Sequence, residues 1–297
     1  MVPLLQCFFF LSLLVFPLWV QAVTEPRIVA MGDLHGDLNN TLTIMQFAGL
    51  IDQDHRWSGG DTIFVQTGDV VDRGVDTIAL YELLQRLRKE AQEQGGQVVS
   101  VLGNHEIMNM VGDWRYVHPD DIASFGGKQA RIEAFSKEGW IGSDLFKWNL
   151  TAKVGSSVFC HGGILPKHAQ DGVDGINQRT KESLDMYIHE KHDKYGLFGG
   201  DGPTWYRGFA VGDERICTVL DKALELLKAD RMVMGHTVQR DGRIRARCGG
   251  KAILIDIGIS HVYGGHPGAL EIQGDQVHAI YKHGKEKLIA SHIHEEL

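Results

Sequence analysis

Polar side chains that could bind metal ions recur at five places in the chain, each directly after a short apolar run. The first two places carry the motifs GDLHGD, from residue 32, and GDVVDRG, from residue 68. The other three carry GNHE from residue 103, HGG from residue 161 and GH from residue 235. Carboxylate, imidazole and amide groups without a thiolate suit Mn²⁺, Fe or Zn²⁺. The pattern therefore indicates metal-assisted chemistry.

The candidate ligands are numerous enough for two ions about 3.5–4 Å apart, the arrangement that clamps the oxygens of an in-line displacement. They are Asp33, His35, Asp69, Asn104, His161 and His236. A single motif has a simpler interpretation, because Asp69 alone could cap a helix and Asn104 alone could begin a turn. Five such motifs in order, each flanked by glycine, favour a metal site. Asp69 is the central carboxylate and the candidate bridge.

The apolar runs before these motifs are typical of strands in an α/β sheet. In the first half they alternate with helical stretches, and the runs lie at 27–31, 62–66 and 97–102. One helical stretch places four leucines on one face: Leu80, Leu83, Leu84 and Leu87. This alternation predicts parallel strands joined by crossover helices. Ligands bind outside the carboxyl ends of such strands, so we expect the motifs to converge.

The second half predicts shorter elements and an antiparallel ending. One strand is expected over 153–160, and a helix has its apolar face at Leu220, Ala223, Leu224 and Leu227. Further strands are expected at 231–234, 243–248, 252–256, 269–272 and 276–281. Residues 113–212 are less regular, and the segments on either side of the strand at 153–160 read as insertions. The insertion around 165–212 would shape a substrate groove. Without a linker or a repeat, residues 23–297 are predicted to form one domain.

The motifs GDLHGD, GDVVDRG, GNHE, HGG and GH, in this order, resemble the phosphoprotein phosphatase family of calcineurin-like metallophosphoesterases. The resemblance covers residues 27–281. Asp37 and Leu102 depart from the common serine/threonine enzymes, which have Gln and Arg there. With the segment GISHVYGGHPGALEI, they resemble the bacterial-like Shewanella-like protein phosphatases. The implied fold is α/β, with two mixed β-sheets packed as a sandwich and flanked by helices.

The resemblance assigns the ligands to two metal ions. The first ion would be held by Asp33, His35 and Asp69, and the second by Asp69, Asn104, His161 and His236. Mn is the expected metal, with Fe and Zn as alternatives. Two such cations lower the pKa of a bound water and stabilise the attacking and leaving oxygens of the reaction. The implied reaction is hydrolysis of a phosphomonoester by direct attack of a metal-bound hydroxide.

The family also implies roles for residues beside the ligands. His105 would protonate the leaving group, and Asp72 would orient its imidazole and raise its basicity. Arg73 would bind phosphate oxygens through its planar fork, and Arg207 is the candidate for a second phosphate-binding arginine, or else a solvated loop residue. The remaining candidates would support the site, with structural roles as the alternative: Asp37, Glu106 and Tyr263.

The expected substrate is a phosphorylated protein, and the branch that the sequence resembles includes phosphatases that favour phosphotyrosine. A dinucleoside polyphosphate hydrolase of the same superfamily is the alternative, although Glu106 after His105 favours the phosphoprotein enzymes. A non-catalytic metal-binding module is a second alternative, and it predicts the loss of a ligand or of the acid, all of which are present. Cys160 lacks the phosphate-cradling loop of a cysteine phosphatase.

The composition is that of a globular protein with an acidic balance. The 297 residues include 38 acidic and 30 basic side chains, for a formal net charge of −8, and 43% are hydrophobic. This balance argues against sequence-independent binding to nucleic acid, which needs clustered Lys and Arg. The 36 glycines exceed the usual share of about 7% and predict many tight turns. The oligomeric state is left open.

Both ends resemble targeting signals. Residues 1–22 carry no charged side chain and end in Val20-Gln21-Ala22, which favours a cleaved signal peptide; a membrane anchor is the alternative. The end His294-Glu295-Glu296-Leu297 resembles endoplasmic reticulum retention signals. These features predict a protein of the endoplasmic reticulum lumen, with secretion as the alternative. A membrane contact is expected only if the N-terminal segment is uncleaved.

An oxidising lumen bears on the cysteines and on two glycosylation sequons. Cys7 would leave with the signal peptide, so Cys217 and Cys248 could form a disulfide. Cys160 would then be free and buried at a strand end. The sequons at Asn39 and Asn149 become candidate glycosylation sites. Three histidines of the irregular segment are expected at the surface: His168, His189 and His192.

Overall fold

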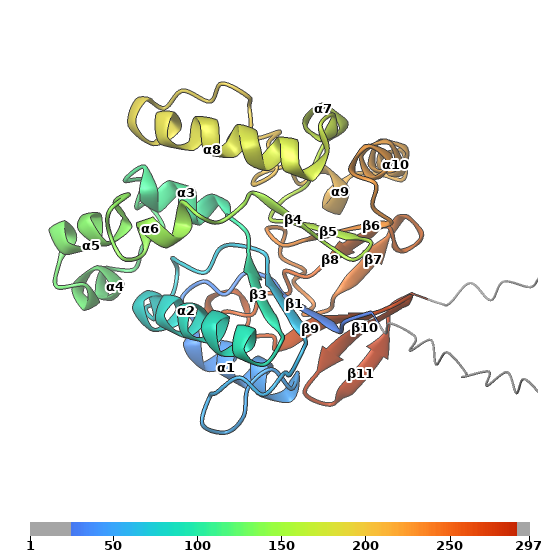
Figure 1. The fold of residues 1–297 in the computed structure, drawn as a ribbon, viewed down its shortest axis with the longest axis horizontal. Coiled ribbons are helices and arrows are strands. Elements are labelled where there is room, and N and C mark those ends of the chain that lie inside the picture. The colour runs from blue at the N-terminus through green and yellow to red at the C-terminus, as the bar shows by residue number, and fades with distance from the viewer. Residues whose placement is uncertain (1–24, 290–297) are drawn as a thin grey trace, which may run out of the picture.

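Two β-sheets pack face to face between layers of helices in the computed structural model, which describes residues 25–289 (Figure 1). The expected signal peptide, residues 1–22, and the retention signal, residues 294–297, lie outside the described residues. The α/β sandwich predicted from the sequence is confirmed. Within the described range, no helix is both long enough and apolar enough to cross a lipid bilayer.

The first sheet carries the first three motifs. Its order is β11-β10-β9-β1-β2-β3, with β1, β2 and β3 parallel and the other pairs antiparallel. The three parallel strands therefore end at the same edge of the sheet. Their bounds are β1 Ile28–Met31, β2 Ile63–Gln66 and β3 Gln97–Ser100, followed later by β9 Gly268–Gln273, β10 Gln276–Tyr281 and β11 Gly284–Lys287. The last of these was not predicted.

The second sheet carries the other two motifs and has the order β4-β5-β6-β8-β7. Strands β5, β6 and β8 are parallel, whereas β4 and β7 pair antiparallel at the edges. The bounds are β4 Thr151–Val154, β5 Ser157–Cys160, β6 Arg231–Met234, β7 Arg245–Arg247 and β8 Ala252–Leu254. The single strand expected over 153–160 is wrong, because Gly155 turns the chain with a φ of 57° and creates a hairpin.

Helices cover the outer faces of both sheets (Figure 1). The first sheet is covered by α1 (Leu38–Phe47) and α2 (Thr77–Glu93), and the second by α7 (Pro166–Ala169), α8 (Gly172–Glu190), α9 (Gly208–Val211) and α10 (Ile216–Leu227). The predicted apolar faces of α2 and α10 are buried. The 19-residue α8 was not predicted because its buried face includes Asn177, Thr180 and Ser183, which weakens the apolar pattern.

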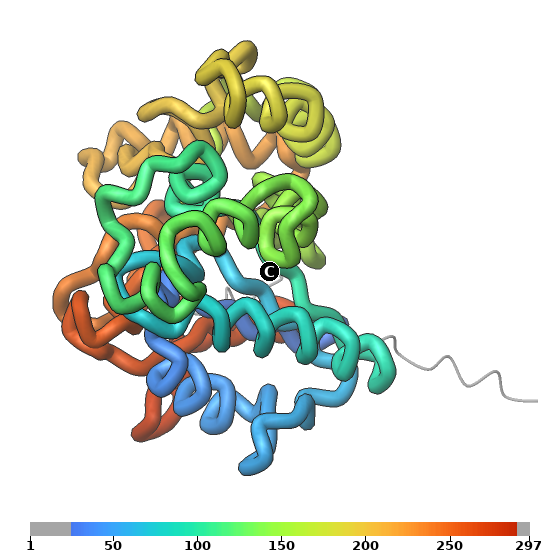
Figure 2. Tube along the Cα trace, turned by 90° about the vertical axis from the view of Figure 1, so that its left-hand side faces the viewer, coloured from blue at the N-terminus to red at the C-terminus, as the bar shows by residue number. Residues whose placement is uncertain are grey.

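The remaining helices stand at one end of the sandwich, where β3 ends. They are α3 (Asn104–Met110), α4 (Pro119–Ser124), α5 (Lys128–Phe135) and α6 (Gly142–Leu145), coloured green in Figures 1 and 2. Two short 3₁₀ helices complete the chain, η1 (Cys248–Gly250) and η2 (His261–Tyr263). The segment 113–212, read as irregular, therefore contains the β4–β5 hairpin and six helices, all of them short except α8.

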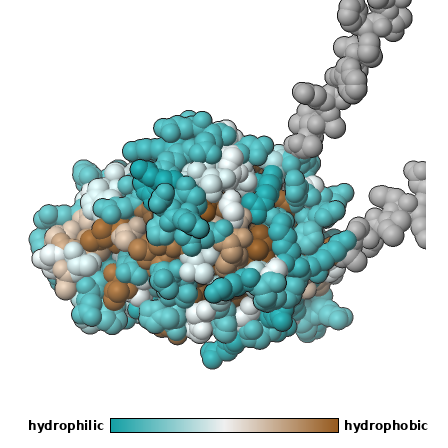
Figure 3. Space-filling view, turned by 90° about the horizontal axis from the view of Figure 1, so that it is seen from below, coloured by the Kyte–Doolittle hydropathy of each residue, from teal (hydrophilic) through white to brown (hydrophobic). Residues whose placement is uncertain are grey.

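The core lies between the sheets. All residues of β1 and β5 are buried, as expected for strands covered on both faces. The outside is different: Figure 3, seen from below, shows a mostly hydrophilic face with scattered hydrophobic patches.

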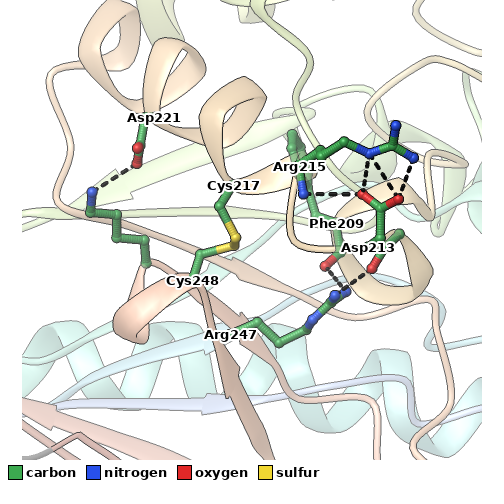
Figure 4. The surroundings of a disulfide bond; sticks show 9 residues. Phe209, Asp213, Arg215, Cys217, Asp221, Arg247 and Cys248 are labelled. Atoms are coloured by element: carbon green, nitrogen blue, oxygen red, sulfur yellow. Dashed lines mark hydrogen bonds and ion pairs between the residues drawn. A yellow bond between two sulfur atoms is a disulfide. The ribbon is translucent and has the colours of Figure 1, made fainter.

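The cysteines behave as the sequence allowed. Cys217, in the first turn of α10, forms a disulfide with Cys248, directly after β7 (Figure 4). Cys160 is free and buried, and burial raises the pKa of its thiol, so it is a poor nucleophile. The surface location expected for His168 is wrong, because its ring packs inside and contacts the carbonyl oxygen of Asp201 at 3.1 Å.

The remaining candidates for a surface location are two histidines and the two asparagines of the glycosylation sequons. His189 and His192 are exposed, as predicted. Asn39 is exposed on α1, whereas Asn149 is half-buried, and glycosylation of either stays a prediction.

Candidate active site

The five motifs meet in one pocket of about 290 Å³ at the carboxyl ends of the strands. Its lining includes most of the predicted site residues: Asp33, His35, Asp69, Arg73, Asn104, His105, Arg207, His236 and Tyr263. Two predicted residues lie just behind the lining, because His161 and Asp72 are fully buried. The convergence expected from the strand ends is therefore present, although the two sets of motifs come from different sheets.

Asp69 is the centre of this cluster. Its Oδ2 lies 3.1 Å from His161 Nε2, 3.7 Å from His35 Nε2 and 3.8 Å from His105 Nε2. Two groups of side chains in the described residues could each hold a metal ion, and Asp69 belongs to both. One group adds His161 and His236; the other adds His35 and His105. The first of the predicted ions was assigned to Asp33, His35 and Asp69; in the group that contains His35 and Asp69 the third member is His105, and Asp33 belongs to neither group.

Each of the three predicted histidine ligands is held by a backbone carbonyl. His35 Nδ1 donates to Val71 at 3.0 Å, His161 Nδ1 to Thr67 at 2.8 Å and His236 Nε2 to Trp205 at 3.1 Å. A carbonyl oxygen only accepts, so these nitrogens carry the protons. The other nitrogen of each ring is thereby turned toward the pocket, as in metal sites whose ligands are oriented by outer hydrogen bonds.

The atoms that face one another in the pocket are mostly acceptors. His161 Nε2 lies 3.1 Å from His236 Nδ1 and 2.9 Å from the Oδ1 of Asn104. The amide nitrogen of Asn104 points to the sulfur of Met108, which directs the oxygen inward. Acceptors crowded in this way need a cation between them, and N and O donors of this kind fit a divalent metal ion.

A further buried carboxylate, Asp256, adds to this demand and was not singled out in the sequence. It follows β8, one strand beyond the predicted motifs, and its Oδ2 has no hydrogen-bond partner. Burial raises the pKa of Asp256 to about 6. Burial, and next the repulsion from Asp256, also raise the pKa of Asp33 well above its ordinary value. The pocket therefore holds more negative charge than its own cations balance.

The histidines respond to the same field. Burial opposes the charged form of His161, but Asp69 and Asp33 outweigh it and raise its pKa to about 10. His236 behaves in the opposite way, because burial and the charge of His161 lower its pKa to about 2. Burial likewise lowers the pKa of His35 to about 4. Without a metal, the cluster draws one proton to its centre, which is where a cation is best stabilised.

The backbone at these strand ends is strained. Five of the nine non-glycine residues with positive φ belong to the predicted site: His35, Asp69, Asp72, Arg73 and His236. Such conformations cost about 1–3 kcal/mol each and persist where function requires a particular side-chain direction. Gly103 is required for a different reason, because a Cβ there would lie 2.2 Å from the Oδ1 of Asp69. The loops are shaped around the ligand atoms.

His105 and Asp72 form a hydrogen-bonded pair beside Asp69. The Nδ1 of His105 donates to Asp72 Oδ2 at 2.6 Å, and its Nε2 faces the pocket. Burial disfavours the charged imidazole, but Asp69 and Asp72 outweigh it and raise the pKa of His105. A protonated His105 can therefore give a proton to a group bound in the pocket.

A buried chain of polar groups continues behind this pair. Asn109 donates to Asp72 Oδ1 at 2.8 Å and accepts from Arg131 at 2.9 Å. Arg131 is fully buried and forms an ion pair with Asp121, which in turn accepts from the hydroxyl of Thr77 at 3.0 Å. None of these residues was predicted. Asn109 lies four residues after His105 on α3, which is the only sequence signal that could have indicated it.

The predicted phosphate-binding arginines both reach the pocket. The guanidinium of Arg73 lies 3.9 Å from the centre of the Tyr116 ring, and its Nε has no hydrogen-bond partner. Arg207 donates to the carbonyl of His236 and to Thr237 Oγ1. An unpartnered buried N–H that lines the pocket is available to an anion. Trp205 and Tyr116 also line the pocket and were not predicted.

Glu106, Asp37 and Tyr263 support the loops. The carboxylate of Glu106 accepts from the backbone N–H groups of Asp69, Val70 and Gly103, each at 2.8 Å, so it ties the loops after β2 and β3 together. Asp37 caps α1 through Asn40 and accepts from the backbone of His261. The ring of Tyr263 lies 5.2 Å from that of His35.

Comparison with known proteins gives a family, relatives and a similar fold. The model of the calcineurin-like phosphoesterases matches residues 26–240. Shewanella-like protein phosphatase 2 of Arabidopsis thaliana is 34% identical, over 84% of this chain and 75% of its own length. An uncharacterised protein of Schizosaccharomyces pombe is 40% identical, over 88% and 82%. The crystal structure of a cold-active protein-tyrosine phosphatase of a psychrophilic Shewanella species superposes with a TM-score of 0.78, at 27% identity, over 89% and 80%.

Proposed function

The chain belongs to the calcineurin-like phosphoesterases, in the branch of the Shewanella-like protein phosphatases, and is a hydrolase of that family; on this premise we propose that it is a dinuclear-metal phosphoprotein phosphatase that prefers phosphotyrosine. The observation that carries the proposal is the cluster around Asp69, in which ring nitrogens and carboxylate oxygens face one another beside the His105–Asp72 pair. This arrangement can bind cations and deliver a proton at the same place.

Two divalent ions fit the donor set, with Mn favoured and Fe or Zn as alternatives. One would be held by Asp33, His35 and Asp69, and the other by Asp69, Asn104, His161 and His236. When bound, these ions activate a water and neutralise charge on the phosphoryl oxygens. Their charge would also relieve the repulsion between Asp33 and Asp256.

The side chains of the protein perform the remaining steps. Arg73 and Arg207 bind and orient the phosphoryl oxygens, so that the scissile bond points toward His105. His105 donates its Nε2 proton to the leaving oxygen, and Asp72 stabilises the imidazolium before transfer. No covalent intermediate on the protein is required, in keeping with the buried, protonated thiol of Cys160.

The preference for phosphotyrosine is supported by the aromatic rim of the pocket and by one enzyme of similar structure. The pocket is lined by three aromatic residues, Tyr116, Trp205 and Tyr263. The ring of a phosphotyrosine bound there would therefore contact aromatic side chains. The superposable Shewanella enzyme is named a protein-tyrosine phosphatase.

The test compares three substrates with the purified protein after metal loading. Phosphotyrosine peptides should give the largest kcat/KM, phosphoserine and phosphothreonine peptides a smaller one, and dinucleoside polyphosphates none above background. Faster turnover of the dinucleotide than of every phosphopeptide would overturn the assignment and favour the nucleotide-hydrolysing alternative. Metal binding without turnover of any phosphoester would leave only the non-catalytic module.

For location, we propose the endoplasmic reticulum lumen. The Cys217–Cys248 disulfide supports it, because disulfides persist in oxidising compartments. We expect the protein to carry N-glycans that stay sensitive to endoglycosidase H, and removal of residues 294–297 to release it into the medium. Release of the intact protein would favour secretion, and resistance to alkaline extraction from membranes would favour an uncleaved anchor.

A further inference from the structure

The arginines of the chain fall into two groups, those with a carboxylate partner and those without one. The sequence holds fifteen arginines, all within residues 25–289. Ten of them form an ion pair with an Asp or Glu. Among the described residues, five have no carboxylate partner: Arg73, Arg207, Arg231, Arg240 and Arg247. In a chain of net charge −8, cations left without a carboxylate point to where an external anion binds.

Four of these five arginines lie along one path. Arg73 and Arg207 line the catalytic pocket, and Arg240 lines both that pocket and a neighbouring groove of about 560 Å³. Arg247 lines the groove alone. We call this second space the arginine groove; its lining comes from residues 238–241 and 245–247, with Ala210 and Leu254. The two spaces share Val238 and Arg240, so the groove continues from the catalytic pocket.

The charges of the groove are held in defined positions. Arg247 is half-buried and donates to the carbonyl oxygens of Phe209, at 2.7 Å, and Gly212, beside α9 (Figure 4). These carbonyls fix the guanidinium without neutralising its full charge. Arg245 pairs with Asp241 on the exposed rim, at 2.6 Å. An exposed pair of this kind is worth little, so a carboxylate from another molecule can compete for Arg245.

From this path we propose that the arginine groove binds acidic side chains next to the phosphorylated residue of the substrate. The inference rests on the proposed phosphatase function and names its substrate class: phosphoproteins with Asp or Glu on one side of the target residue. Guanidinium groups bind carboxylates through paired hydrogen bonds, and the groove lies beside the pocket that would hold the phosphate. Because Arg240 is exposed and unpaired by a carboxylate in the described chain, it is the first contact.

The experiment uses two phosphotyrosine peptides that differ only in three flanking residues, Asp-Glu-Asp or Asn-Gln-Asn, placed before or after the target. The intact enzyme should give a higher kcat/KM for the acidic peptide in one of the two orientations, by about tenfold at 50 mM salt. The ratio of kcat/KM for the acidic peptide to kcat/KM for the neutral peptide should fall toward one at 500 mM salt, because the ion pairs are screened. R240A should lower the ratio by about three- to fivefold, the value of one partly exposed ion pair, and R240E should lower it further.

Arg231→Ala is the matched control. Arg231 is also without a carboxylate partner, but it begins β6 at the end away from the pocket and contacts Ser157. R231A should leave the ratio unchanged. A wild-type ratio near one in both orientations would overturn the proposal that the arginine groove binds acidic side chains. Equal ratios for R240A and R231A would overturn it as well. The proposed function fails separately, if neither peptide is hydrolysed at all, and that result would remove the inference as well.

Discussion

Two buried clusters of charged side chains stand side by side near the end of β3, and they are balanced in opposite ways. In the cluster of Arg131, Asp121 and Asn109, the cation has a carboxylate partner and the amide is hydrogen-bonded on both sides. In the cluster around Asp69 and Asp256, carboxylates crowd together and the Oδ2 of Asp256 has no partner. The charges of the first cluster are matched within the chain, although the Nε of Arg131 has no hydrogen-bond partner, whereas the second cluster has excess carboxylates, which we propose are balanced by bound metal ions.

The difference separates stability from function. A cluster whose charges are matched should be costly to break but distant from the reacting atoms. A cluster with excess negative charge should lower the stability of the metal-free fold, and binding of metal ions should raise that stability. Substitutions in the balanced cluster are therefore expected to change the free energy of unfolding, and substitutions around Asp69 to change turnover.

Asp69→Asn is expected to have the largest effect. The change removes the carboxylate common to both candidate metal groups, so kcat/KM should fall by more than about 10³-fold, since each ion supplies several kcal/mol to the transition state. Steady-state kinetics with a phosphotyrosine peptide, together with metal analysis, measure it. Two bound ions in the variant would contradict the bridging role of Asp69.

His105→Asn removes the proposed acid and leaves the metal ligands in place. Turnover should fall by about 10²–10⁴-fold, the usual range for loss of general acid catalysis. The loss should be greatest for alkyl phosphates, whose leaving oxygens need the proton most. Metal content should not change. A loss of metal together with activity would instead make His105 a ligand, in agreement with its place beside His35 and Asp69.

Arg131→Met tests the balanced cluster. The buried carboxylate of Asp121 would lose its partner, so the free energy of unfolding should fall by about 3–5 kcal/mol, as measured by urea denaturation of the metal-free protein. Arg115→Met is the control, because the Arg115–Asp113 pair is exposed and should matter little. Equal destabilisation by the two substitutions would show that the buried pair has no special role.

The smallest expected effect is a pH dependence confined to the metal-free protein. The pKa of His161 is about 10 in the fold, above the ordinary value of 6.5, so the folded state holds a proton that the unfolded chain releases. The stability from this group is full below pH 6.5 and is lost as pH rises toward 10, by at most about 1.4 kcal/mol per pH unit.

Urea unfolding at pH 7 and pH 8 measures this slope. The interval avoids most of the titration of His35 and His236, which are neutral there in the fold and largely neutral in the unfolded chain. Metal loading or His161→Gln should flatten the difference between the two pH values. An equal slope in the H161Q variant would show that the proton is held elsewhere.

The parts of the fold that could be predicted are those with a strong local signal. The strands at 231–234 and 276–281 match the structure, because short apolar runs are bounded there by turns. The ligand motifs of each sheet could be predicted to lie together because parallel strands end at one edge, whereas the meeting of the two sets depends on how the two sheets pack. The hairpin over 151–160 was missed because one positive-φ glycine decides it.

The unpredicted parts depend on contacts between distant segments. Arg131 and Asp121 lie in short helices without a clear apolar period, and nothing local shows that they meet beneath Asp72. His168 reads as a surface residue until Asp201, far along the chain, covers it. The arginine groove is similar, because its unpaired charges are recognised only when the partners of every other arginine are known.

The most direct test of the account is the turnover of a phosphotyrosine peptide by the metal-free protein as Mn²⁺ is added back, measured against the number of ions bound per chain. Binding at both groups around Asp69 predicts that turnover is absent without metal and reaches its plateau at two ions per chain. Full turnover without metal, or a plateau at a single bound ion, would contradict the dinuclear phosphatase.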